Sequence, residues 1–144
     1  MLIKIYVLAD KLICFDLKNG ITDLVKGQSE RKFVLYSDMQ LLIDAGFEGS
    51  RLMSLMIDQV GYELSESYPD AMKANDWSEF LDLGADVTRR VMDEMYAVRK
   101  HALKKAPAAK LDCKYHYHGG EQKTVCKMWA FEGGKAVERN VQVS

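Results

Sequence analysis

The sequence predicts an α+β fold in a single domain covering residues 1–144, on three observations. Short stretches rich in Ile, Val and Tyr near the N-terminus are typical of strands. Apolar residues between 76 and 105 recur every three or four positions, which is a helical period. After Pro107, apolar and polar residues alternate, as they do along a strand. At 144 residues and 48% hydrophobic, the chain is long enough for one core.

The N-terminal part is expected to form antiparallel strands at residues 2–8, 12–17 and 21–25. Asn19-Gly20 is the strongest hairpin signal there, because a type I′ turn needs positive φ at both central residues. A fourth short strand is expected at 33–36, after a polar loop.

The central part is expected to be helical. A short helix follows Ser37 or Asp38 and ends at Gly46, and Ser50 caps a second helix that ends near Glu66. The third and longest helix runs from about 76 to 105, with Asp76 as its cap and Pro107 beyond its end. Gly84 lies within the stripe of apolar and small residues on this helix, and we expect it to mark a close crossing by the helix that begins at Ser50.

The C-terminal part is expected to be a three-stranded meander with tight turns at Gly119-Gly120 and Gly133-Gly134. A two-residue turn at the first pair sets Cys113 opposite Cys126. A turn at the second sets Cys126 opposite Val141 and Ala130 opposite Val137. Both registers place the apolar residues on one face, which favours this arrangement.

Charge is unevenly distributed along a chain whose formal net charge is −1. Residues 1–37 carry +2 (six basic, four acidic), residues 38–98 carry −9 (four basic, thirteen acidic), and residues 99–144 carry +6 (ten basic, four acidic). The leading hypothesis is a small cytoplasmic protein-binding module, an inhibitor, adaptor or accessory factor, whose acidic face meets a partner with a basic surface. The candidate residues of that face are Asp58, Glu63, Glu66, Asp70, Asp76 and Glu79.

The alternative hypothesis is a nucleic-acid-binding protein that uses the basic region 99–127, where cations neutralise phosphates and rings stack on bases. Its candidate residues are Arg99, Lys100, Lys104, Lys105, Lys110, Lys114, Tyr115 and Tyr117. Acids at the start and bases at the end of a long helix also stabilise the helix dipole, so the pattern has a structural explanation as well. A third hypothesis is a small enzyme that uses His116 and His118 as acid or base.

No metal site and no cofactor are expected. Cys113, His116, His118 and Cys126 are zinc-type donors. However, a regular strand would send Cys113 to one face of the sheet and both histidines to the other. The odd number of cysteines, three, fits a reducing compartment better than a secreted disulfide framework. No stretch is apolar enough for a membrane span, and the last strand is expected to offer an edge for homo-oligomer formation.

Overall fold

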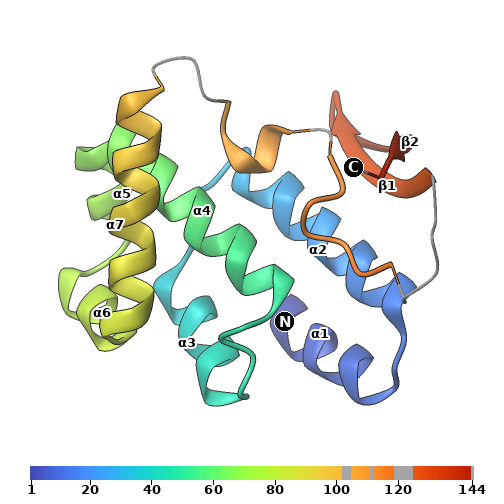
Figure 1. Ribbon diagram of the computed structural model, residues 1–144, viewed down its shortest axis with the longest axis horizontal. Helices are drawn as coiled ribbons and strands as arrows, with labels where there is room; N and C mark the ends of the chain where they lie inside the picture. Colours follow the sequence, from blue (N-terminus) through green and yellow to red (C-terminus); the bar gives the residue numbers. More distant parts are fainter. Residues whose placement is uncertain (102–104, 111, 119–124, 144) are drawn as a thin grey trace.

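The structure is a computed structural model that describes residues 1–101, 105–110, 112–118 and 125–143. These residues form seven α-helices, one 3₁₀ turn and one two-stranded antiparallel sheet (Figure 1). The expected α+β fold is therefore wrong, because the protein is mostly helical. The elements are α1 (Leu2–Lys11), α2 (Phe15–Ser29), α3 (Tyr36–Asp44), α4 (Arg51–Glu66), α5 (Tyr68–Ala74), α6 (Trp77–Asp82), α7 (Ala85–Lys100), η1 (Pro107–Ala109), β1 (Val125–Glu132) and β2 (Lys135–Gln142).

The N-terminal strands expected from the sequence are wrong. This part of the chain forms the helices α1 and α2, which run in roughly opposite directions (Figure 1). Ile3, Tyr6 and Ala9 are all buried, and their spacing of three defines one face of α1. Asn19-Gly20 lies inside α2, where Gly20 has helical backbone and open space around its Cα. Packing against the helical core outweighs both the strand propensity of the apolar run and the local turn signal.

The strand expected at 33–36 is wrong: residues 33–35 have no regular secondary structure and Tyr36 begins α3, and the backbone here bonds to side chains and not to a neighbouring strand. The Val34 N–H donates to the Glu63 carboxylate at 3.2 Å. Asn75 accepts from the Tyr36 N–H at 3.0 Å and donates to the Val34 carbonyl at 3.0 Å. These side chains take the place of a partner strand, and α3 begins directly afterwards.

Helix α4 crosses the middle of the molecule, with α5, α6 and α7 on one side and α2 with the hairpin on the other (Figure 1). The caps predicted at Ser50 and Asp76 are confirmed: Ser50 accepts from the Met53 N–H, and Asp76 accepts from the Ser78 N–H. Most of α4 is buried, including Leu52, Leu55 and Ile57. Apolar residues thus surround this helix on several sides.

The prediction of a single long helix at 76–105 is wrong, because the structure has two helices here, α6 and α7. Gly84 has φ +92°, so it ends α6 and precedes α7. The expected close crossing exists between α4 and α7, but the glycine that permits it is Gly61. A Cβ at Gly61 would lie 2.7 Å from the Glu94 Cβ and 3.1 Å from the Val91 carbonyl oxygen. Gly84 has nothing within 4 Å of such a Cβ.

At the C-terminus, the predicted register of the second hairpin is confirmed. Cys126 pairs with Val141 and Ala130 pairs with Val137, and both Gly133 and Gly134 have positive φ. The prediction of a further strand before the first Gly-Gly pair is wrong, because residues 112–118 form a bend and a turn. The turn expected at Gly119-Gly120 lies outside the described residues.

Candidate functional site

The acidic candidates divide into internal and exposed groups. Asp58 accepts from Lys114 Nζ at 2.6 Å and from the Tyr115 hydroxyl at 2.7 Å. Glu63 is buried. The remaining four residues, Glu66, Asp70, Asp76 and Glu79, are exposed along the end of α4, α5 and α6. Only these four can form an acidic surface, and Asp76 also caps α6.

Glu63 has an unusual environment for a carboxylate. Its side chain is 6% exposed and accepts from Val34 N–H and from Gln59 Nε2 at 3.1 Å. Burial raises the pKa of Glu63 to about 7, although the bonds from Gln59 and Val34 favour its ionised form. This residue therefore joins α4 to the segment before α3 and titrates near neutrality.

The basic candidates are brought together only in part. Arg99, Lys100 and Lys105 are exposed, whereas Lys104 lies outside the described residues. The Lys110 carbonyl accepts from Lys26 Nζ at 2.7 Å, and Lys114 is paired with Asp58. The two aromatic candidates are occupied within the fold: Tyr115 is 3% exposed, and Tyr117 stacks on Phe15 with ring centroids 6.2 Å apart. No stacking platform for bases follows from these two rings.

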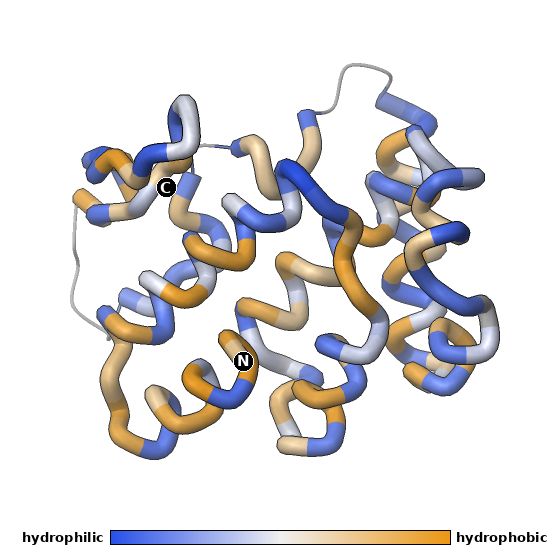
Figure 2. The backbone as a smooth tube through the Cα atoms, turned by 180° about the vertical axis from the view of Figure 1, so that it is seen from behind, coloured by the Kyte–Doolittle hydropathy of each residue, from blue (hydrophilic) through white to orange (hydrophobic). Residues whose placement is uncertain are grey.

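A run of large apolar side chains is exposed where α1 turns into α2. We call these residues the apolar corner: Leu8, Leu12, Ile13, Phe15 and Leu17, with exposed fractions between 38% and 74%. The turn between the first two helices is largely apolar in Figure 2. Exposed apolar residues scattered singly are ordinary, whereas a group of them at one turn is a candidate contact surface.

The backbone at the apolar corner follows a Schellman motif. The Cys14 N–H donates to the Ala9 carbonyl at 2.9 Å, and the Ile13 N–H donates to the Asp10 carbonyl at 2.9 Å. This motif places its C′ residue in the left-handed region, where glycine is usual. Here the C′ residue is Ile13, at φ +54°. A β-branched residue in this conformation is a genuine outlier.

The enzyme candidates His116 and His118 belong to the turn of residues 112–118, and His116 faces strand β1. His116 Nδ1 is 3.1 Å from Cys126 Sγ, and His116 Nε2 is 2.7 Å from Asp23 Oδ1. Cysteine, histidine and aspartate in this order resemble the parts of a nucleophilic triad. However, Asp23 and His116 are each 1% exposed and Cys126 is 5% exposed, so a substrate has no access to them.

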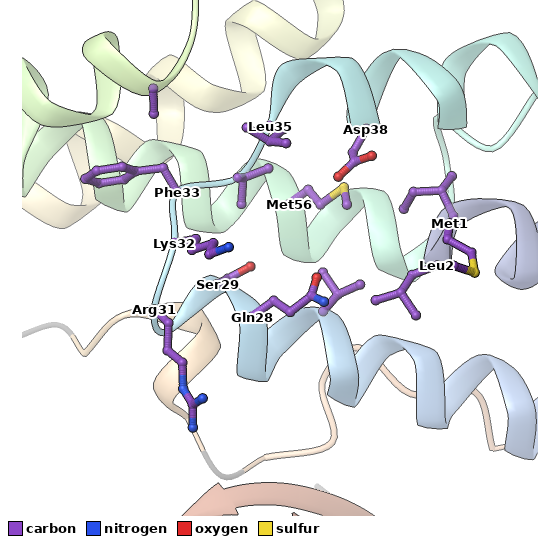
Figure 3. A pocket seen from close by; sticks show the side chains of 14 residues that line it. Met1, Leu2, Gln28, Ser29, Arg31, Lys32, Phe33, Leu35, Asp38 and Met56 are labelled. Carbon is purple, nitrogen blue, oxygen red and sulfur yellow. The ribbon is translucent and has the colours of Figure 1, made fainter. Parts of the chain in front are cut away.

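A hollow of about 560 Å³ opens between α1, α2 and the segment before α3 (Figure 3). Apolar side chains such as Leu2, Phe33 and Met56 line it together with Gln28 and Asp38. Such a hollow is large enough for a small molecule. Ser29, Arg31 and Lys32 line it as well, and we assign it no ligand.

No family model, no curated protein and no solved structure matches this chain. Within the part of the chain that the structure describes, no helix has the length and apolar character needed to cross a bilayer.

Sequence reasoning missed the apolar corner because its residues fall in or beside the two strands predicted at 2–8 and 12–17, whereas the structure has helices there. It also missed Asp23, which lies 93 positions from its partner His116. No local pattern marks such a long-range contact. The exposed acidic residues were visible in the sequence as a charge excess, but their division between surface and interior was not.

Proposed function

We propose that this protein is a protein-binding module of the inhibitor, adaptor or accessory-factor class, acting in the cytoplasm, and that the apolar corner is its contact surface. The observation that supports this proposal most strongly is the conformation of Ile13, which combines a left-handed backbone with a side chain that is 74% exposed.

The energetic cost of the left-handed backbone at Ile13 and the exposure of its side chain both favour a role in binding a partner. The left-handed conformation costs a non-glycine residue roughly 1–2 kcal/mol. The exposed side chain returns little of this cost within the chain, because most of its surface stays in water. Contact with a second protein would bury that surface, at a gain of about 25 cal/mol per Å². A strained, exposed apolar residue is therefore better suited to binding than to folding.

The corner rests on a rigid base. Lys18 forms an ion pair with Asp10, which joins α2 to α1 beneath the turn. The same ammonium lies 3.8 Å from the centre of the Tyr117 ring, and Tyr117 stacks on Phe15. A surface held in one shape loses little conformational entropy when it binds.

The exposed acidic residues Glu66, Asp70 and Glu79 lie at the opposite end of the molecule from the corner (Figure 1). Salt screens exposed charges over about 8 Å, so these acids do not steer a partner onto the corner. In this proposal they form a second, separate contact for a partner with a basic surface.

The nucleic-acid alternative has less support. Tyr115 is buried, Tyr117 is half-buried against Phe15, and Lys114 is paired with Asp58. Retention of the protein on DNA or RNA at low salt, falling steeply as salt rises, would favour this alternative over protein binding.

The proposed function is tested by capture with immobilised full-length protein, followed by identification of bound proteins and reconstitution of the interaction with the purified partner. Ile13→Gly should abolish binding while preserving the fold, because glycine suits the C′ position. Leu81→Ala is a matched control, since Leu81 is 63% exposed and lies on α6, away from the corner. Unchanged affinity of Ile13→Gly and of Leu12→Ser for the purified partner would contradict the proposal.

A further inference from the structure

The turn of residues 112–118 brings cysteine and histidine donors together. One ligand atom from each of Cys113, His118 and Cys126 can be chosen so that all three lie within 4.8 Å of one another. Cys113 and Cys126 are buried, and His118 is half-buried. Cys113 and His118 come from the turn, and Cys126 from the start of β1.

His116 lies on the same turn, outside that group of three, and approaches it through Cys126. Its backbone N–H donates to the Cys113 carbonyl at 3.0 Å, so the chain folds back between these two residues. Its Nδ1 faces Cys126 Sγ at 3.1 Å. Because the chain folds back here, its side chains do not alternate as they would along a strand. Cys113 and the two histidines can therefore lie on the same side of the turn.

The other side of the His116 ring is fixed by Asp23. Asp23 Oδ1 lies 2.7 Å from His116 Nε2, and Asp23 Oδ2 accepts from the Trp129 N–H at 2.8 Å. Metal-binding histidines commonly donate their second ring N–H to a carboxylate, which sets the tautomer and orients the ring. In that tautomer Nε2 carries the proton, and Nδ1 presents a lone pair toward Cys126.

We propose that Cys113, His116, His118 and Cys126 bind one zinc ion as a closed structural centre, with Asp23 as the residue that positions His116. Two thiolates and two neutral imidazoles balance the charge of Zn²⁺. A tetrahedral site with these donors has edges of about 3.3–3.8 Å. The three donors within 4.8 Å therefore need side-chain movements of about an ångström to close on the ion. Sulfur and nitrogen donors select zinc over magnesium or calcium, which prefer oxygen.

A zinc ion at this position would stabilise the C-terminal hairpin. The sheet has two strands, and a two-stranded sheet on its own is marginally stable in water. Most of β2 is exposed, so the hairpin has one buried face, formed by Cys126, Met128 and Ala130 on β1. Structural zinc contributes directly to folding in such small elements. An ion here would join the turn to β1 and, through Asp23, to α2.

Two other arrangements of the same residues make different predictions. A nucleophilic triad of Cys126, His116 and Asp23 needs an accessible sulfur, and the burial of all three argues against it. A disulfide between Cys113 and Cys126 would remove both thiolates. The structure contains all three cysteines as thiols.

The test uses the untagged full-length protein and its metal content. Protein purified with zinc present should contain one zinc ion per chain. Cobalt added to the metal-stripped protein should give the visible absorption of tetrahedral Co²⁺ and an ultraviolet thiolate charge-transfer band. Cys113→Ser and Cys126→Ser should each lose the charge-transfer intensity of one thiolate and most of the bound zinc. Cys14→Ser is the matched control, because Cys14 lies at the start of α2 and outside the cluster.

The zinc proposal is overturned by any of three results. These are zinc-free protein whose thermal stability is the same with added zinc, a cobalt spectrum without thiolate bands, or equal zinc content in Cys126→Ser and Cys14→Ser. Thiol counting under denaturing conditions covers the disulfide arrangement: one titratable thiol per purified chain, and none in Cys14→Ser, would assign Cys113 and Cys126 to a disulfide and exclude the metal. Because the cobalt titration uses unmodified protein, the proposal stays testable if a variant does not fold.

Discussion

Glu63 makes the stability of this protein depend on pH in a way that can be calculated. Its pKa is raised from 4.5 to about 7 in the folded protein, with burial as the largest cause. The folded state therefore binds the proton more tightly than the unfolded state. Stability from this group is fully present below pH 4.5 and is lost as the pH rises through 7. The difference in pKa corresponds to about 3 kcal/mol.

The assay is urea unfolding of wild type and Glu63→Gln at pH 5 and pH 8. Linkage predicts that this one residue makes the wild type about 2–3 kcal/mol less stable at pH 8 than at pH 5. Glutamine does not ionise, so the substitution should remove this part of the pH dependence. Glu66→Gln is the control, because Glu66 is on the same helix and exposed.

The comparison between variants separates Glu63 from the other groups that titrate over the same range. If wild type and Glu63→Gln lose equal stability between pH 5 and pH 8, the carboxyl is not held in the buried environment described here. The contact between α4 and the segment before α3 would then need revision.

Three further predictions concern packing, the metal centre and assembly. In urea titrations, Gly61→Ala should lower the free energy of unfolding by about 1–3 kcal/mol, because the new Cβ would meet Glu94 and the α7 backbone. Gly20→Ala, where the new Cβ lies in open space, should raise it by up to about 1 kcal/mol. Asp23→Asn should weaken zinc affinity about 10- to 100-fold by competition with a chromophoric chelator, and an unchanged affinity would remove Asp23 from its positioning role. β2 pairs with β1 alone among the described strands, and we propose that its outer edge forms a homo-oligomer; light scattering should show mass rising with concentration, and a constant monomer mass would count against it.

The features that the sequence predicted correctly are local ones. Ser50 and Asp76 cap helices through bonds to residues two or three positions away. The hairpin register follows from Gly133-Gly134, because two adjacent residues with positive φ define a type I′ turn. Signals of this range do not need knowledge of the rest of the fold.

The features that failed depend on tertiary contacts. The apolar run at residues 2–8 fits a strand or a buried helix equally well by composition, and the helical core selects the helix. Asn19-Gly20 is a strong turn signal that the packing of α2 overrides. The alternation from Cys113 to His118 predicts a strand, which would separate the metal donors, whereas the chain folds back at His116 and brings them together. Asp23, distant in sequence, is recognisable only once α2 is placed beside β1.

The measurement that tests the proposed function most directly is a paired one on Ile13→Gly: the free energy of unfolding and the affinity for the captured partner. Glycine relieves the left-handed strain and removes an exposed side chain, so stability should rise by about 1 kcal/mol while affinity falls. Opposite changes in stability and binding would show that Ile13 serves the partner and not the fold. A variant that loses stability and keeps full affinity would contradict the proposed function.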